Sequence, residues 1–128
     1  MTLLSEPPYS LRRALVLEDD DSMAEFIASV MVREGFQVDV ERDGLAGLRR
    51  CQAENFAMIV ADVRMPRLSG LSFFSNLRLT VNASTPVVVI SAIDDPAIRR
   101  QAVELGARAF LQKPFDAEQL VAAITPGA

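Results

Sequence analysis

The sequence alternates short apolar runs with segments in which apolar residues recur at helical spacing, and this alternation is its strongest constraint on the fold. Five segments indicate strands, at residues 14–17, 36–42, 56–61, 86–91 and 108–112. The segments that follow them predict helices over 23–31, 44–55, 71–77, 96–105 and 116–124. Five such strand–helix units predict an α/β fold in which one parallel sheet is covered by helices on both faces.

The length and composition of the chain favour a single domain. It has 128 residues, half of them hydrophobic, which is enough to bury a substantial core. The start, "MTLLSEPPYSL", lacks the basic region of a signal peptide. Its Pro-Pro pair indicates an irregular lead-in over 1–11, before a folded domain over 12–128. No apolar run approaches the roughly 20 residues of a membrane helix, and Cys51 has no second cysteine to pair with. We therefore expect a cytoplasmic protein that does not bind membranes, in which Cys51 is a helix residue without chemistry.

Negative charge is concentrated in one short stretch, "LVLEDDDSM", where four acids, Glu18 to Asp21, follow a buried run. The net charge is -4, from 13 basic and 17 acidic residues. Without those four acids and Asp62, the 13 basic residues face 12 acidic ones, so the excess comes from what we interpret as one site. The charge and the lack of a basic stripe argue against direct binding to nucleic acid.

Polar residues stand at the carboxyl ends of four of the five predicted strands. Glu18 and Asp19 follow the first strand, Asp62 the third, Ser91 the fourth and Lys113 the fifth. Ligands of open α/β sheets bind at this edge, so we expect these side chains to lie together. Lys113 is the only lysine, and the chain contains no histidine, which excludes histidine as a base, metal ligand or phosphoryl carrier within it.

These residue types suit phosphoryl transfer to a carboxylate. Three carboxylates without histidine or cysteine favour a hard cation such as Mg2+ or Mn2+. A carboxylate can act as the nucleophile and form an acyl phosphate, while a lysine and a hydroxyl hold the phosphoryl oxygens. Phosphoryl transfer requires mainly positioning and charge stabilisation, which this set of groups can supply.

The sequence resembles the receiver domain of two-component response regulators, from about Arg12 to Ile124. The motifs that carry the resemblance are "VLEDDDSM", "VERDGLAGL", "VADVRMPRLSG", "VVVISA" and "GARAFLQKPF", which are specific only in combination. The resemblance implies a flavodoxin-like (βα)5 fold, with a single doubly wound, five-stranded parallel sheet. It also implies a phosphoacceptor switch in a phosphorelay, which catalyses only its own phosphorylation and dephosphorylation.

The resemblance implies a role for each residue at the site. Asp62 would be the phosphoacceptor and a direct metal ligand. Asp19 would bind the metal directly, Glu18 through water, and Arg64 through its backbone carbonyl. Glu18 departs from the aspartate found at this position in many members of the family.

It also implies a second group of residues that respond to the phosphoryl group. Ser91 would contact it and Lys113 would pair with it, before a cis peptide bond to Pro114. Phe110 matches an aromatic switch position, although an aromatic residue in a fifth strand can also be simply packed. The switch would change the surface of the fourth helix, fifth strand and fifth helix.

The sequence carries two further predictions near the acids. We expect Asp21 or Ser22 to cap the first helix, where a polar or negative group suits the helix terminus. Arg64 and Ile93 lie two residues after Asp62 and Ser91, where they would flank the path of the water that hydrolyses the acyl phosphate. We expect them to obstruct this water and to prolong the phosphorylated state.

Two alternatives to the signalling switch remain open. One is a phosphatase with an aspartyl nucleophile. Such an enzyme would need a second aspartate two residues after Asp62, and this chain has Arg64 at that position. The other is a pseudo-receiver that binds partners without phosphorylation, against which the acids, the hydroxyl and the lysine are all present. The resemblance implies a sensor histidine kinase or a histidine phosphotransfer protein as donor, an output domain or protein as target, and a phosphorylation-dependent homodimer as one possible outcome.

Overall fold

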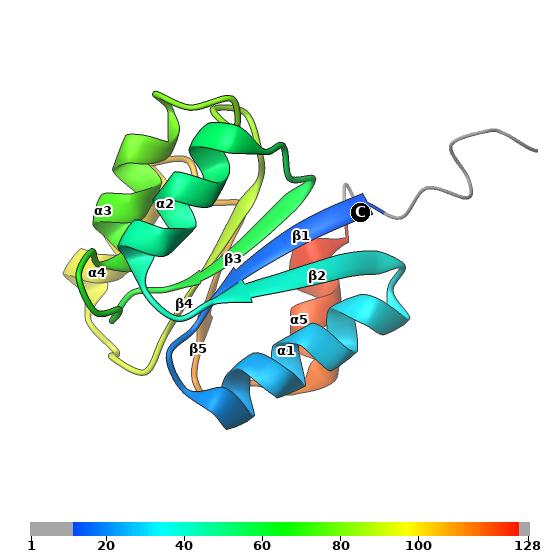
Figure 1. The fold of residues 1–128 in the computed structure, drawn as a ribbon. Coiled ribbons are helices and arrows are strands. Elements are labelled where there is room, and N and C mark those ends of the chain that lie inside the picture. The colour runs from blue at the N-terminus through cyan, green and yellow to red at the C-terminus, as the bar shows by residue number, and fades with distance from the viewer. Residues whose placement is uncertain (1–11, 126–128) are drawn as a thin grey trace, which may run out of the picture.

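The computed structural model describes residues 12–125, so the predicted lead-in over 1–11 lies outside the described residues. Its strands form one parallel sheet in the order β2-β1-β3-β4-β5 (Figure 1). The strands are β1 (Arg12–Leu17), β2 (Phe36–Glu41), β3 (Met58–Asp62), β4 (Val87–Ser91) and β5 (Ala109–Gln112). The five strands lie where the alternating pattern predicts them.

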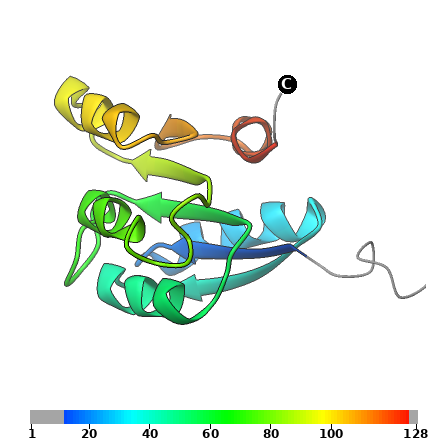
Figure 2. The same cartoon turned by 90° about the horizontal axis from the view of Figure 1, so that it is seen from above.

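One helix follows each strand, and the helices cover both faces of the sheet. They are α1 (Asp21–Arg33), α2 (Gly44–Ala53), α3 (Gly70–Leu77), α4 (Pro96–Glu104) and α5 (Ala117–Ile124). Figure 1 and Figure 2 show α1 and α5 on one face and α2, α3 and α4 on the other. This arrangement confirms the predicted flavodoxin-like, doubly wound (βα)5 fold. Within residues 12–125, none of these helices has the length and apolar character required to cross a bilayer.

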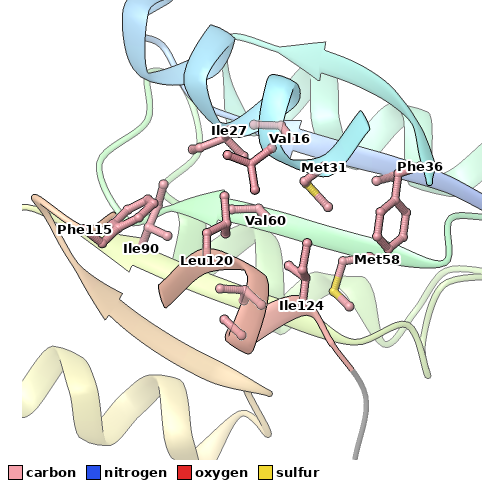
Figure 3. Packing of buried hydrophobic residues seen from close by; sticks show 14 residues of the cluster. Val16, Ile27, Met31, Phe36, Met58, Val60, Ile90, Phe115, Leu120 and Ile124 are labelled. Carbon is pink, nitrogen blue, oxygen red and sulfur yellow. The ribbon is translucent and has the colours of Figure 1, made fainter. Parts of the chain in front are cut away.

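The sheet separates two hydrophobic clusters. The first lies between the sheet and helices α1 and α5, where Ile27, Met31, Leu120 and Ile124 pack on Val60 and neighbouring strand residues (Figure 3). The second fills the opposite face, beneath α2, α3 and α4. Strands β3 and β4 are buried along their whole length, which explains why their sequences are continuously apolar instead of alternating.

The register brings the carboxyl ends of the central strands to one edge. Leu17 of β1 is paired with Ala61 of β3, and Asp62 is paired with Ile90 of β4. Ser91 is paired with Gln112 of β5. The residues that follow these strand ends therefore emerge side by side.

Each helix begins at a polar residue whose side chain accepts a backbone N–H of the first turn. These residues are Asp20, Asp43, Ser69, Asp95 and Asp116. The prediction that Asp21 or Ser22 caps the first helix is therefore wrong. Asp20 has an extended backbone and accepts the N–H of Met23 at 2.8 Å, and Asp21 is already helical. Consecutive polar residues left the exact cap open, since each can accept such a hydrogen bond.

Candidate functional site

Three carboxylates meet at the carboxyl edge of the sheet. One oxygen atom from each of Glu18, Asp19 and Asp62 can be chosen so that all three lie within 4.8 Å of one another. Glu18 and Asp62 are buried, whereas Asp19 is exposed. The end of β1 delivers the first two residues and the end of β3 delivers the third, as the strand pattern predicts.

Lys113 joins two of these acids. Its Nζ atom lies 2.8 Å from Glu18 Oε1 and 2.8 Å from Asp62 Oδ2. Lys113 follows β5 directly, and its backbone N–H donates to the carbonyl of Ser91 at the end of β4. The peptide bond between Lys113 and Pro114 is cis, the geometry that the resemblance implies.

Burial and pairing shift the ionisation of this cluster. Burial raises the pKa of Glu18, as does the nearby charge of Asp62, while hydrogen bonds from Lys113 and the Asp20 backbone act against that rise. Burial alone would lower the pKa of Lys113, but its hydrogen bonds to Asp62 and Glu18 outweigh that effect and raise its pKa. The lysine therefore stays charged and balances only one of three carboxylates.

The remaining negative charge fits a hard divalent cation. Glu18 uses both of its carboxylate oxygens, because Oε1 accepts from Lys113 and Oε2 accepts the N–H of Asp20 at 3.1 Å. Asp19 is exposed, and Oδ1 of Asp62 accepts only a long contact of 3.3 Å from the N–H of Arg64, so these two carboxylates are better placed to contact a cation directly. Oxygen ligands from two carboxylates, completed by a carbonyl and water, are what Mg2+ and Mn2+ prefer.

The hydroxyl of Ser91 is buried at the end of β4 and is turned toward the following loop. Its Oγ atom accepts the N–H of Ile93 at 3.0 Å and lies 3.3 Å from the carbonyl of Ile93. To donate to a phosphoryl oxygen at Asp62, the hydroxyl would have to give up its donation to the carbonyl of Ile93. Ser91 is thus close to the site in the fold but engaged elsewhere in this conformation.

Phe110 lies partly buried on β5, on the face covered by α4. It packs against the second hydrophobic cluster, and the guanidinium carbon of Arg99 lies 4.5 Å from the centre of its ring. The contact with Arg99 was missed at the sequence level, since no spacing in the chain links a residue on α4 to a ring on β5. The ring is packed and remains partly accessible, so both interpretations of Phe110 are compatible with this conformation.

A shallow cavity of about 580 Å³ opens beside Asp19, the exposed acid of the cluster. Arg64 and Ile93, which we expected to flank the path of water, both line it. The N–H of Arg64 lies 3.3 Å from Asp62 Oδ1. Met65 and Pro66, which the sequence places in the loop after Asp62, also line this cavity, together with Val63 and Ser69, which carried no signal in the sequence.

Comparison with known sequences connects this geometry to one family. The profile of the response regulator receiver domain matches residues 14–125. The response regulator ArlR of Staphylococcus saprophyticus is 32% identical over 114 residues, which are 89% of this chain and 51% of that protein. The chain therefore spans about half the length of the curated relatives it matches.

Solved structures of response regulators are also similar to this chain. A response regulator of Burkholderia pseudomallei, solved with a phosphorylated aspartic acid, calcium ion and citrate, superposes with a TM-score of 0.80 at 28% identity; the match covers 90% of this chain and 67% of that one. The receiver domain of Francisella response regulator 1452 gives a TM-score of 0.78 at 32% identity, covering 87% of this chain and 91% of the other.

Proposed function

Because the chain belongs to the response regulator receiver domain family, whose members are signalling switches of two-component systems, we propose that Asp62 is the phosphoacceptor of this switch. The observation that carries the proposal is the position of Asp62, which is buried at the strand edge, clusters with Glu18 and Asp19, and pairs with Lys113. The phosphorylated aspartic acid of the Burkholderia pseudomallei response regulator supports the same chemistry.

In the proposed reaction, a carboxylate oxygen of Asp62 attacks the phosphorus of a phosphohistidine on a sensor kinase or phosphotransfer protein, or of a small phosphodonor. The bond from phosphorus to the leaving group breaks, and the leaving group keeps the electron pair. Lys113 stabilises the charge that develops on the phosphoryl oxygens. Asp19 and Asp62 would hold a divalent cation, Mg2+ or Mn2+, directly, together with the carbonyl of Arg64, and Glu18 would hold it through water. The cation would neutralise charge on the phosphoryl oxygens.

The phosphoryl group would then act on Ser91 and Phe110. Binding of the Ser91 hydroxyl to a phosphoryl oxygen would remove it from Ile93, and so loosen the loop before α4. Phe110 could then move on the face shared by α4 and β5. This movement would favour a second conformation of the surface formed by α4, β5 and α5. That surface would recruit an output domain, an output protein or a second copy of the chain.

The remaining parts of the proposal concern the setting of the switch. We infer a cytoplasmic location, because the phosphodonors of this chemistry are produced there. The proposed domain covers 12–128, of which 14–125 match the family profile. We expect no direct contact with nucleic acid or membranes, and no catalysis beyond the domain's own phosphorylation and dephosphorylation. Turnover of an external phosphate ester would instead support the phosphatase alternative.

A metal titration tests the proposed site. Asp19→Asn should weaken Mg2+ binding and slow phosphorylation, because it removes the exposed carboxylate of the cluster. Asp21→Asn is the matched control, since Asp21 is an exposed acid two residues away that pairs with Arg42 instead. Equal Mg2+ affinity in wild type and the Asp19→Asn protein would contradict the assignment. A pseudo-receiver would show no phosphorylation in any of the three proteins.

A further inference from the structure

A strained turn lies in the loop between β3 and α3. Arg67 has a φ of 70°, and within residues 12–125 it is the only residue other than glycine with a positive φ. The N–H of Leu68 donates to the carbonyl of Pro66 at 2.7 Å, so these three residues form a γ-turn of the rare, strained kind. Such strain persists where neighbouring structure holds it, and it concentrates at functional sites.

The beginning of α2 holds this turn in place. The N–H of Gly44 donates to the same carbonyl of Pro66, at 3.3 Å. A Cβ atom on Gly44 would lie 1.9 Å from the carbonyl oxygen of Leu68, a distance that no side chain tolerates. Asp43, which caps α2, also places a carboxylate oxygen 3.8 Å from Nε of Arg67. Only glycine allows the helix to rest directly on the turn.

The same loop forms one wall of the phosphorylation site. Pro66 and Arg64 both line the cavity that Asp19 of the acidic cluster also lines. The backbone N–H of Arg64 approaches the carboxylate of Asp62, and the carbonyl of Arg64 is one of the proposed metal ligands. The far end of the loop is anchored by the hydrogen bond from Gly70 N–H to the carbonyl of Val63, at 2.9 Å. If the turn shifts, the residues between Val63 and Pro66 must shift with it, and these include Arg64.

We propose that Gly44 is a positioning residue for the metal and phosphoryl site. It touches neither the metal nor the phosphoryl group, and acts by holding the strained turn that sets the position of Arg64. This inference rests on the proposed function, because it requires that the site bind Mg2+.

The test compares two glycine-to-alanine variants in the same helix. Gly44→Ala pushes against the backbone of Leu68 within the loop, whereas Gly47→Ala would meet only the end of the Leu17 side chain, at 2.4 Å, and no loop backbone. Both changes disturb packing of α2, so both should lower thermal stability. Only Gly44→Ala should weaken Mg2+ binding in a titration, by about tenfold, the lower end of what displaced supporting residues cost metal sites. Phosphorylation by acetyl phosphate should slow in parallel.

Hydrogen exchange of the wild-type protein supplies a second test that needs no variant. If the turn positions the metal site, Mg2+ binding must in return stabilise the turn, so exchange of the Gly44 and Leu68 amides should slow when Mg2+ is added. Unchanged exchange there, or equal Mg2+ affinity in Gly44→Ala and Gly47→Ala, would overturn this inference and leave the proposed function intact. A wild-type protein that binds no Mg2+ would overturn both.

Discussion

Four consecutive acids are tolerated because each has a different environment. Glu18 is buried against Lys113, and Asp19 faces the open side of the candidate metal site. Asp20 caps α1, and Asp21 is exposed beside Arg42. Lys113, the start of α1 and solvent thus each stabilise part of the negative charge, which reduces the repulsion within the stretch. Only the first two acids belong to the site.

Two side chains at the mouth of the cavity should control the lifetime of the phosphorylated state. Arg64 and Ile93 line the same cavity as Asp19, and the backbone N–H of Arg64 lies 3.3 Å from Asp62 Oδ1, so a hydrolytic water that reaches Asp62 through this cavity must pass them. The Arg64→Asn, Ile93→Glu double variant opens this approach and offers groups that orient water, so dephosphorylation should accelerate by on the order of tenfold, about 1.4 kcal/mol of barrier. The measurement is the loss of phosphoryl label after the donor is removed. Equal or slower loss would show that these side chains do not shield the site.

Arg99 should hold the ring of Phe110 in its present position. Its guanidinium lies over that ring, and an exposed contact of this kind contributes about 0.5–1 kcal/mol, a two- to fivefold bias. Arg99→Ala should move the fluorine resonance of a fluorophenylalanine placed at position 110 toward its position with beryllofluoride, a phosphoryl mimic. Arg100→Ala is the matched control on the same helix. If both variants leave the resonance unchanged, Arg99 does not restrain the position of the Phe110 ring.

The candidate site was predictable where it depends on strand ends. Asp62 and Ser91 end strands β3 and β4, Lys113 follows β5, and parallel strands bring such residues to one edge. The orientation of Ser91 toward Ile93 and the stacking of Arg99 were not predictable, because they depend on side-chain rotamers. The γ-turn at Arg67 was equally hidden, since arginine carries no signal for a positive φ.

At the scale of elements, a single buried amide fixes the end of α2 to the rest of the fold. Asn82, in the loop before β4, is fully buried. It donates to the carbonyls of Cys51 and Glu54 at 2.8 and 2.7 Å, and accepts the N–H of Phe56 at 2.7 Å. These three backbone groups lie where α2 ends and the chain turns toward β3, so Asn82 replaces hydrogen bonds that a longer helix would have made.

Asn82→Ala should therefore reduce the free energy of unfolding by about 2–4 kcal/mol, because it leaves three backbone groups without partners. Asn76→Ala removes only a bond from an accessible side chain to the carbonyl of Ser72, and should cost less than about 0.5 kcal/mol. Urea denaturation of both variants makes the comparison. A small effect of Asn82→Ala, equal to that of the control, would contradict the role given to this amide.

The elements themselves were predicted because their signals are local. Apolar runs specify β3 and β4, and Asp95 with Pro96 specifies the start of α4, where Asp95 indeed accepts the N–H of Ala97. The start of α1 was misplaced by one residue or more because Asp20, Asp21 and Ser22 are all suitable caps. The role of Asn82 was not predicted, since its partners are 26 to 31 residues away in the chain.

At the scale of the whole molecule, an ionic network joins the first strand, the edge strand and α2. Arg13 pairs with Asp39 and Glu54, and Arg50 pairs with Asp39, Glu41 and Glu54. Hydrogen bonds from Arg50 and then Arg13 lower the pKa of Glu54 to about 2. The network lies at the opposite end of α2 from Gly44, so it contributes to stability away from the candidate site.

The pH dependence of stability should reflect Glu54. Its pKa is about 2 in the folded protein and near 4.5 in the unfolded chain, so its stabilising effect is complete above about pH 4.5 and is lost as the pH falls toward 2. Glu54→Gln should therefore be less stable than wild type at pH 7, with a smaller difference at about pH 3. Urea unfolding at both values tests this, with the exposed Glu25→Gln as control. A difference that does not change with pH would show that the charge of Glu54 does not stabilise the fold.

The central claim is that the domain carries a phosphoryl group on Asp62, and intact-mass measurement tests it most directly. Wild-type protein incubated with acetyl phosphate and Mg2+ should gain the mass of one phosphoryl group, and should lose it again when the donor is removed. The Asp62→Asn protein should gain none under the same conditions, and wild type should gain none when EDTA replaces Mg2+. A wild-type protein that gains no mass, or an Asp62→Asn protein that gains the same mass at the same rate, would contradict the account.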